Sequence, residues 1–66
     1  MSTFIDRLKE EATELENKVM KLGDFIDNNP TFHEIDEIQQ HLLSIQYSTM
    51  LTYLNLLGKR IYFLTK

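Results

Sequence analysis

The last ten residues, LGKRIYFLTK, place three cations among aromatic and aliphatic side chains. No acidic residue follows Glu37, so Lys59, Arg60 and Lys66 make this end locally positive. A guanidinium binds phosphate through a planar fork of donors, and nearby aromatic rings offer faces on which bases stack. The segment therefore predicts one of two roles. Copies of Arg60 from several subunits converge on a bound anion, or the cations only complement the negative end of a helix dipole.

Residues suited to catalysis or metal binding are not arranged for either role. His33 and His41 lie eight residues apart, and the chain has no cysteine and no cluster of histidine and acid at ligand spacing. A glycine-rich phosphate loop and a nucleophile elbow are missing, and Asp36 with Glu37 suits a helix N-terminus better than acid–base chemistry. We expect a protein that is not an enzyme, with no catalytic residues, no metal and no cofactor.

Charge and composition exclude further classes of protein. The net charge of −3 argues against DNA or RNA binding through phosphate neutralisation, because such domains usually carry a basic excess. The apolar run over 42–57 is shorter than the roughly 20 residues that span a bilayer, and polar residues interrupt it, so we expect no membrane partner. The absence of cysteine and of a signal-peptide pattern after Met1 fits a cytoplasmic protein.

The elements that position these residues are predicted to be two helices in a single domain spanning 1–66. Apolar residues alternate at spacings of three and four along helix 1, about 3–27, with Ser2 or Thr3 as its N-cap. The turn, 28–31, contains Pro30 and asparagines that tolerate left-handed conformations. Helix 2, about 32–64, follows. The apolar stripe of helix 1 comprises Ile5, Leu8, Ala12, Leu15, Val19, Leu22 and Ile26.

Helix 2 carries two apolar stripes, whereas helix 1 has only one face to cover them. The first stripe comprises Ile35, Ile38, Leu42 and Ile45 and continues through Thr49 and Thr52 to Leu56; the second comprises Leu43, Tyr47, Met50, Leu54, Leu57, Ile61 and Leu64. Large exposed apolar patches are rare on soluble monomers. We therefore expect an all-α fold, an antiparallel two-helix hairpin that assembles into a homo-oligomeric helical bundle. Gly58 permits close approach of another backbone.

Three sequence blocks resemble a family of small phage proteins that counter bacterial immunity. They are KLGDFI in helix 1, and QYSTMLTY and LGKRI in helix 2. Over residues 4–61 the chain resembles the helical hairpin domain of anti-CBASS cyclic-oligonucleotide sponges, which is shared with anti-Thoeris sponges of cyclic ADP-ribose isomers. The resemblance implies a homo-oligomer, typically a hexamer, that sequesters immune second messengers in the host cytoplasm without cleaving them. The implied ligands are cyclic GMP-AMP or other cyclic dinucleotides, and cyclic triadenylate.

The resemblance also assigns roles to individual residues. Lys21 corresponds to a lysine that contacts the phosphate of a cyclic dinucleotide between protomers, and Phe4 to an aromatic residue that stacks on a base. Arg60 corresponds to an arginine that gathers around a three-fold axis to hold a cyclic trinucleotide. Where some members place a hydroxyl that helps at this axis, the chain has Gly23. The alternative function is a non-enzymatic oligomerisation or adaptor module that binds a partner protein's helix.

Overall fold

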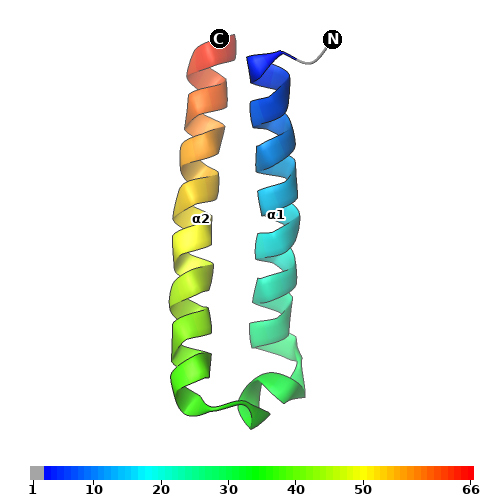
Figure 1. Ribbon diagram of the computed structural model, residues 1–66, viewed down its shortest axis with the longest axis vertical. Helices are drawn as coiled ribbons and strands as arrows, with labels where there is room; N and C mark the ends of the chain where they lie inside the picture. The colour runs from blue at the N-terminus through cyan, green and yellow to red at the C-terminus, as the bar shows by residue number, and fades with distance from the viewer. Residues whose placement is uncertain (1–2) are drawn as a thin grey trace.

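Two long helices connected by a short turn make up the structure, a computed structural model that describes residues 3–66. Helix α1 spans Phe4–Asn28, a short 3-10 helix η1 spans Pro30–Glu34, and helix α2 spans Glu37–Thr65. The two long helices run antiparallel, and the ends of the described chain lie at the same end of the hairpin (Figure 1). The molecule measures 45 × 19 × 15 Å. Within the described residues, no helix is long and apolar enough to cross a membrane.

A reciprocal cap starts α1. The backbone N–H of Asp6 donates to Oγ1 of Thr3 at 3.0 Å, and the N–H of Thr3 donates to Oδ2 of Asp6 at 3.3 Å. These bonds satisfy two of the backbone donors that the first turn of a helix leaves unpaired, and the carboxylate also suits the positive end of the dipole. Thr3 is therefore the N-cap; the alternative, Ser2, lies outside the described residues.

The connection between the helices is longer than the sequence suggests. The side chain of Asn29 accepts a hydrogen bond from the N–H of Thr31 at 2.9 Å, which opens η1 rather than α2. Helix α2 begins only at Glu37, after an N-cap at Asp36 whose carboxylate accepts from the N–H of Ile38 at 3.2 Å. No residue between 3 and 66, glycine included, adopts a positive φ, so left-handed asparagine does not make this turn.

Phe32 closes the turn end of the hairpin. Its side chain is buried, and its ring meets Phe25 edge to face with the centroids 5.9 Å apart. The side-chain amide of Gln40 donates to the carbonyl of Ile35 at 2.9 Å, which ties the residues before α2 to its first turn. Burial of one aromatic ring therefore holds the connection.

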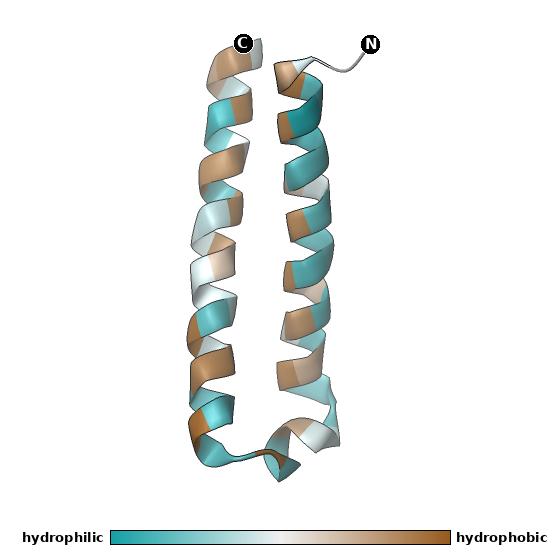
Figure 2. Cartoon of the chain, in the orientation of Figure 1, coloured by the Kyte–Doolittle hydropathy of each residue, from teal (hydrophilic) through white to brown (hydrophobic). Residues whose placement is uncertain are grey.

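The core lies along the seam between α1 and α2. Leu8, Val19, Phe32 and Leu57 are buried, and Leu57 is 0% exposed. All seven residues of the predicted apolar stripe of α1 are buried or half-buried. Figure 2 shows α1 with hydrophobic residues on the side that faces α2 and hydrophilic residues elsewhere. The predicted amphipathic helix is therefore confirmed.

Helix α2 presents one stripe to α1 and the other to the surface. The inner stripe is the second predicted stripe, whose members from Leu43 to Ile61 are buried or half-buried while Leu64 is exposed. On the outer stripe, Ile38, Leu42, Ile45 and Leu56 are each at least half exposed, with values from 50% to 68%. One hairpin thus covers only one stripe of α2, as the sequence predicts.

Candidate ligand-binding site

The first candidate site is a groove where α1 begins and α2 ends, here called the open-end groove. It has a volume of about 400 Å³ and is lined by Phe4, Leu56, Lys59, Arg60, Phe63 and Leu64. Helix α1 contributes Phe4 from its first turn, and α2 contributes the other five residues from its last three turns. Because residues three and four apart share a helix face, Leu56, Lys59 and Phe63 lie one above another.

The lining chemistry combines cations with apolar walls. Lys59 and Arg60 are the two charged lining residues, and neither faces an acid within the lining. The rings of Phe4 and Phe63 are 51% and 65% exposed, so both have faces available to a ligand. The ammonium of Lys66 lies 4.8 Å from the centroid of the Phe63 ring, which adds a third positive charge nearby. Such a groove suits an anion that also carries a flat aromatic group.

A hydrogen bond between the helices lies near the open-end groove. The hydroxyl of Tyr53 on α2 donates to the carboxylate of Glu11 on α1. This bond raises the pKa of Tyr53, as do partial desolvation and the negative charge of Glu11, while the positive charge of Arg60 acts in the opposite direction. Arg60 is therefore close enough to this pair for its charge to act on the phenol.

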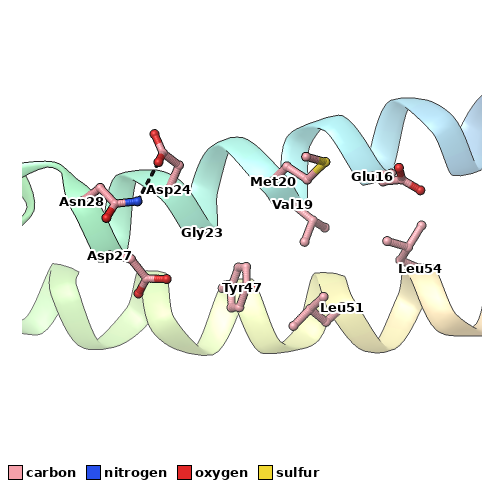
Figure 3. Close-up of a pocket in the computed structure, with 10 residues that line it drawn as sticks. All are labelled: Glu16, Val19, Met20, Gly23, Asp24, Asp27, Asn28, Tyr47, Leu51 and Leu54. Atoms are coloured by element: carbon pink, nitrogen blue, oxygen red, sulfur yellow. Dashed lines mark hydrogen bonds between the residues drawn. The ribbon is translucent and has the colours of Figure 1, made fainter.

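The second candidate site is a groove nearer the turn, here called the turn-side groove (Figure 3). It has a volume of about 600 Å³ and is lined by Glu16, Val19, Met20, Gly23, Asp24, Asp27, Asn28, Tyr47, Leu51 and Leu54. Its lining carries three carboxylates and no cation, the opposite of the open-end groove. Asn28 donates from Nδ2 to Oδ1 of Asp24 at 2.8 Å. No three histidine, aspartate or glutamate side chains between residues 3 and 66 gather closely enough to hold a metal ion.

Gly23 allows Tyr47 to pack directly on α1. A Cβ atom at position 23 would lie 2.9 Å from Cε1 and 3.3 Å from the hydroxyl oxygen of Tyr47, closer than side chains normally approach. In Figure 3 the Tyr47 ring points from α2 toward α1 beside Gly23. At Gly58, by contrast, no neighbouring atom lies within 4 Å of such a Cβ. Within the hairpin, a side chain of α2 therefore packs closely on Gly23, whereas the space beside Gly58 is open.

The structure places three of the four predicted site residues in the two grooves. Phe4 and Arg60 line the open-end groove together, and Gly23 lines the turn-side groove. Lys21 is exposed and lines neither groove. It is 17 residues from Phe4 on the same helix, about 26 Å at the usual helical rise. One hairpin therefore does not bring Lys21 to Phe4.

Sequence reasoning assigned no ligand role to several residues of the two grooves. Lys59 and Phe63 lie beside Arg60 in the open-end groove. Their spacings of three and seven residues from Leu56 place them on the same helix face as that residue, and this spacing could have identified them from the sequence. The turn-side groove had a weaker signal. Its carboxylates, Glu16, Asp24 and Asp27, read as ordinary charges on the exposed face of an amphipathic helix.

Comparison with known proteins places the chain in one family. No curated protein and no solved structure matches it. The family model named Sequestin matches residues 2–63, nearly the whole sequence. The family name denotes sequestration of a ligand, in agreement with the predicted resemblance to sequestering proteins. The chain belongs to the Sequestin family.

Proposed function

We propose that this protein is a phage anti-defence sponge that binds cyclic di- or trinucleotide second messengers of bacterial immunity and withholds them without cleavage. Membership of the Sequestin family supports sequestration as the activity. The observation that carries the choice of ligand is the open-end groove, where Phe4, Arg60 and Lys59 meet. The site of action is the cytoplasm of the host cell, where such messengers would reach their effectors.

The phosphates and the bases of a cyclic nucleotide each have matching groups in the open-end groove. The guanidinium of Arg60 and the ammonium of Lys59 attract the phosphates, and the rings of Phe4 and Phe63 offer stacking surfaces for bases. A sponge needs affinity alone, because a bound messenger is removed from its effector by mass action. The proposal therefore requires no general acid, general base or nucleophile.

The spacing of the candidate residues supports assembly from several copies. Lys21 and Phe4 are about 26 Å apart along α1, farther than one cyclic dinucleotide reaches. If both contact the same dinucleotide, they must come from different copies. The exposed outer stripe of α2 provides apolar surface for such contacts. We propose a homo-oligomer, a hexamer by resemblance, with Arg60 side chains gathered around a trinucleotide and Gly23 at the same axis.

Direct binding tests the proposal. Purified protein is titrated with cyclic GMP-AMP, another cyclic dinucleotide and cyclic triadenylate, with calorimetry and thermal shift as readouts. The ligand is then released by denaturation and analysed by mass spectrometry. We expect a raised melting temperature and intact ligand. Cleaved ligand would indicate an enzyme, and the absence of binding by all three would contradict the proposal.

A matched pair of variants tests the role of Arg60. Losing charge-assisted hydrogen bonds to phosphate should make Arg60→Ala bind cyclic triadenylate about 10- to 100-fold more weakly. Lys18→Ala is the control, since Lys18 is an exposed cation on α1 that lines neither groove. Equal effects of the two changes would mean that only net charge matters, which would remove Arg60 from the site.

The exposed outer stripe favours a second candidate function, an oligomerisation or adaptor module. Ile38, Leu42, Ile45 and Leu56 form an apolar face that another protein's helix could cover. In that case the cations at the end of α2 serve only the helix dipole. An adaptor would bind none of the cyclic nucleotides, and Arg60→Ala would leave its partner binding unchanged.

A further inference from the structure

The turn-side groove has acids at both ends of an apolar floor. Glu16 lies toward one end, and Asp24 and Asp27 lie toward the other, eight and eleven residues further along α1. These separations correspond to about 12 and 16 Å along the helix. Val19, Met20, Tyr47, Leu51 and Leu54 supply the apolar surface between them. An occupant with an apolar group between two cations, one on each side, would match both the apolar floor and the acids at its ends.

The end of α2 presents such an arrangement on its surface. Lys59, Tyr62 and Lys66 follow each other at spacings of three and four, so they share one face of the helix, here called the C-terminal face. Tyr62 is 60% exposed, and within its own hairpin its ring meets that of its neighbour Phe63 edge to face, with the centroids 5.1 Å apart. The two lysines are seven residues apart, about 10 Å along the helix axis. Their flexible side chains add reach toward the two ends of the groove.

We propose that the turn-side groove of one copy receives the C-terminal face of a second copy. Tyr62 would lie on the apolar floor, with Lys59 and Lys66 near the acids at the two ends. Both surfaces occur in every copy at opposite ends of the hairpin, and their charges are opposite, which is why a second copy is the occupant. In one hairpin Lys66 instead rests over Phe63, an exposed contact that the side chain can leave.

This contact would deepen the proposed function. Its relevance to ligand binding rests on that proposed function. The open end of one copy would lie beside the turn end of the other, so Phe4 and Arg60 of one copy would lie at the same level along the pair as Lys21 of the other. A single hairpin keeps these residues apart. Arg60 is not on the C-terminal face and would stay in its own open-end groove, available to a ligand. Lys59 lines that groove in a single hairpin and would turn to the acids of the second copy on docking, which leaves Arg60 as the cation for the ligand.

Charge reversal tests the contact without any ligand. In the groove variant, Glu16→Lys and Asp27→Lys make the groove basic; in the face variant, Lys59→Glu and Lys66→Glu make the C-terminal face acidic. Sedimentation velocity at several protein concentrations and low salt measures the dissociation constant. We expect each variant alone to associate at least about tenfold more weakly, because like charges then face each other. Combining all four changes in one chain should restore association, as should mixing the two variants.

A control variant separates the proposed contact from a general effect of net charge, and the contrary outcomes separate it from the proposed ligand site. Lys9→Glu with Lys18→Glu changes net charge as the face variant does, on exposed positions of α1, and should leave association unchanged. A monomeric wild-type protein, an unchanged dissociation constant in either variant, or no restoration in the fourfold variant would each overturn the contact. Ligand binding is scored independently with Arg60→Ala. Unchanged ligand binding by Arg60→Ala with intact assembly refutes only the site, and ligand binding that is lost in Arg60→Ala without charge-dependent assembly of the protein refutes only the contact.

Discussion

The two long helices differ in how much of their surface the hairpin uses. Helix α1 has one apolar stripe, which α2 covers, and its remaining surface is mostly hydrophilic, with Phe4 and Met20 as exposed apolar residues. Helix α2 has an equally long stripe against α1 and a second one that stays exposed. Helix α1 can therefore be explained by the folding of one chain. Helix α2 carries apolar surface that folding of one hairpin does not require, and this surplus is the strongest sign of a further contact.

Adjacent leucines on α2 give the largest expected contrast. Leu57 is fully buried and Leu56 is 52% exposed, yet both are leucines in the same helical turn. Leu57→Ala should lower the free energy of unfolding by about 2 to 5 kcal/mol, because it leaves a cavity in the seam. Urea unfolding followed by circular dichroism measures this loss, and it should occur at every protein concentration.

The matched variant, Leu56→Ala, should act through association instead. In a self-associating protein the unfolding midpoint rises with protein concentration. We expect Leu56→Ala to weaken that concentration dependence and to change the stability of dilute protein by less than about 1 kcal/mol. Equal losses in both variants at all concentrations would mean that the outer stripe is part of the hairpin core.

The two glycines should respond in opposite directions to alanine. Gly58→Ala should raise the free energy of unfolding by about 1 kcal/mol, since alanine favours the helix and the new Cβ meets nothing within the hairpin. At Gly23 the same gain is opposed by contact with the Tyr47 ring, so Gly23→Ala should lower stability by about 1 to 2 kcal/mol. Urea midpoints of both variants test the comparison. A loss at Gly58 would show that another copy's backbone packs there.

The smallest effect is expected for the bond between the two helices at Tyr53. Its pKa is raised above the ordinary value of 10.0, chiefly by the hydrogen bond to Glu11. The bond therefore contributes stability fully below pH 10 and loses it as the pH rises through the higher pKa of the folded state. Tyr53→Phe should lower the urea midpoint slightly at pH 8, and the difference from wild type should shrink above pH 10. A constant difference across this range would mean that packing, not the hydrogen bond, is responsible.

Most of the fold follows from periodicity, and the part that does not is the connection. The spacing of three and four predicts α1 and both stripes of α2, because helical geometry fixes which residues share a face. The expected start of the second helix near residue 32 precedes the observed start at Glu37. Thr31 and Glu34 have the spacing of a capping box, but burial of Phe32 favours a 3-10 turn there, and Asp36 caps α2 instead. Tertiary packing decides between such competing caps.

The sites depend more strongly on packing between the helices. Arg60 stands out in the sequence by its chemistry, but its meeting with Phe4 depends on which residue of α1 lies opposite which residue of α2. Periodicity predicts which face of each helix is buried, but it does not predict the axial register between the two helices. The turn-side groove needs the register as well, because it forms where Tyr47 meets Gly23. The family resemblance names candidate residues, and the structure shows which of them one chain brings together.

The connection held by Phe32 has a mechanical consequence. It lies at the opposite end of a 45 Å molecule from Phe4 and Arg60, so a small change in the angle between the helices at this pivot is magnified into a larger displacement at the far tips. The connection needs no left-handed residue, so the backbone tolerates substitution there. Replacing one aromatic ring by a smaller side chain would then be a way to adjust the width of a distant opening without altering any residue that lines it.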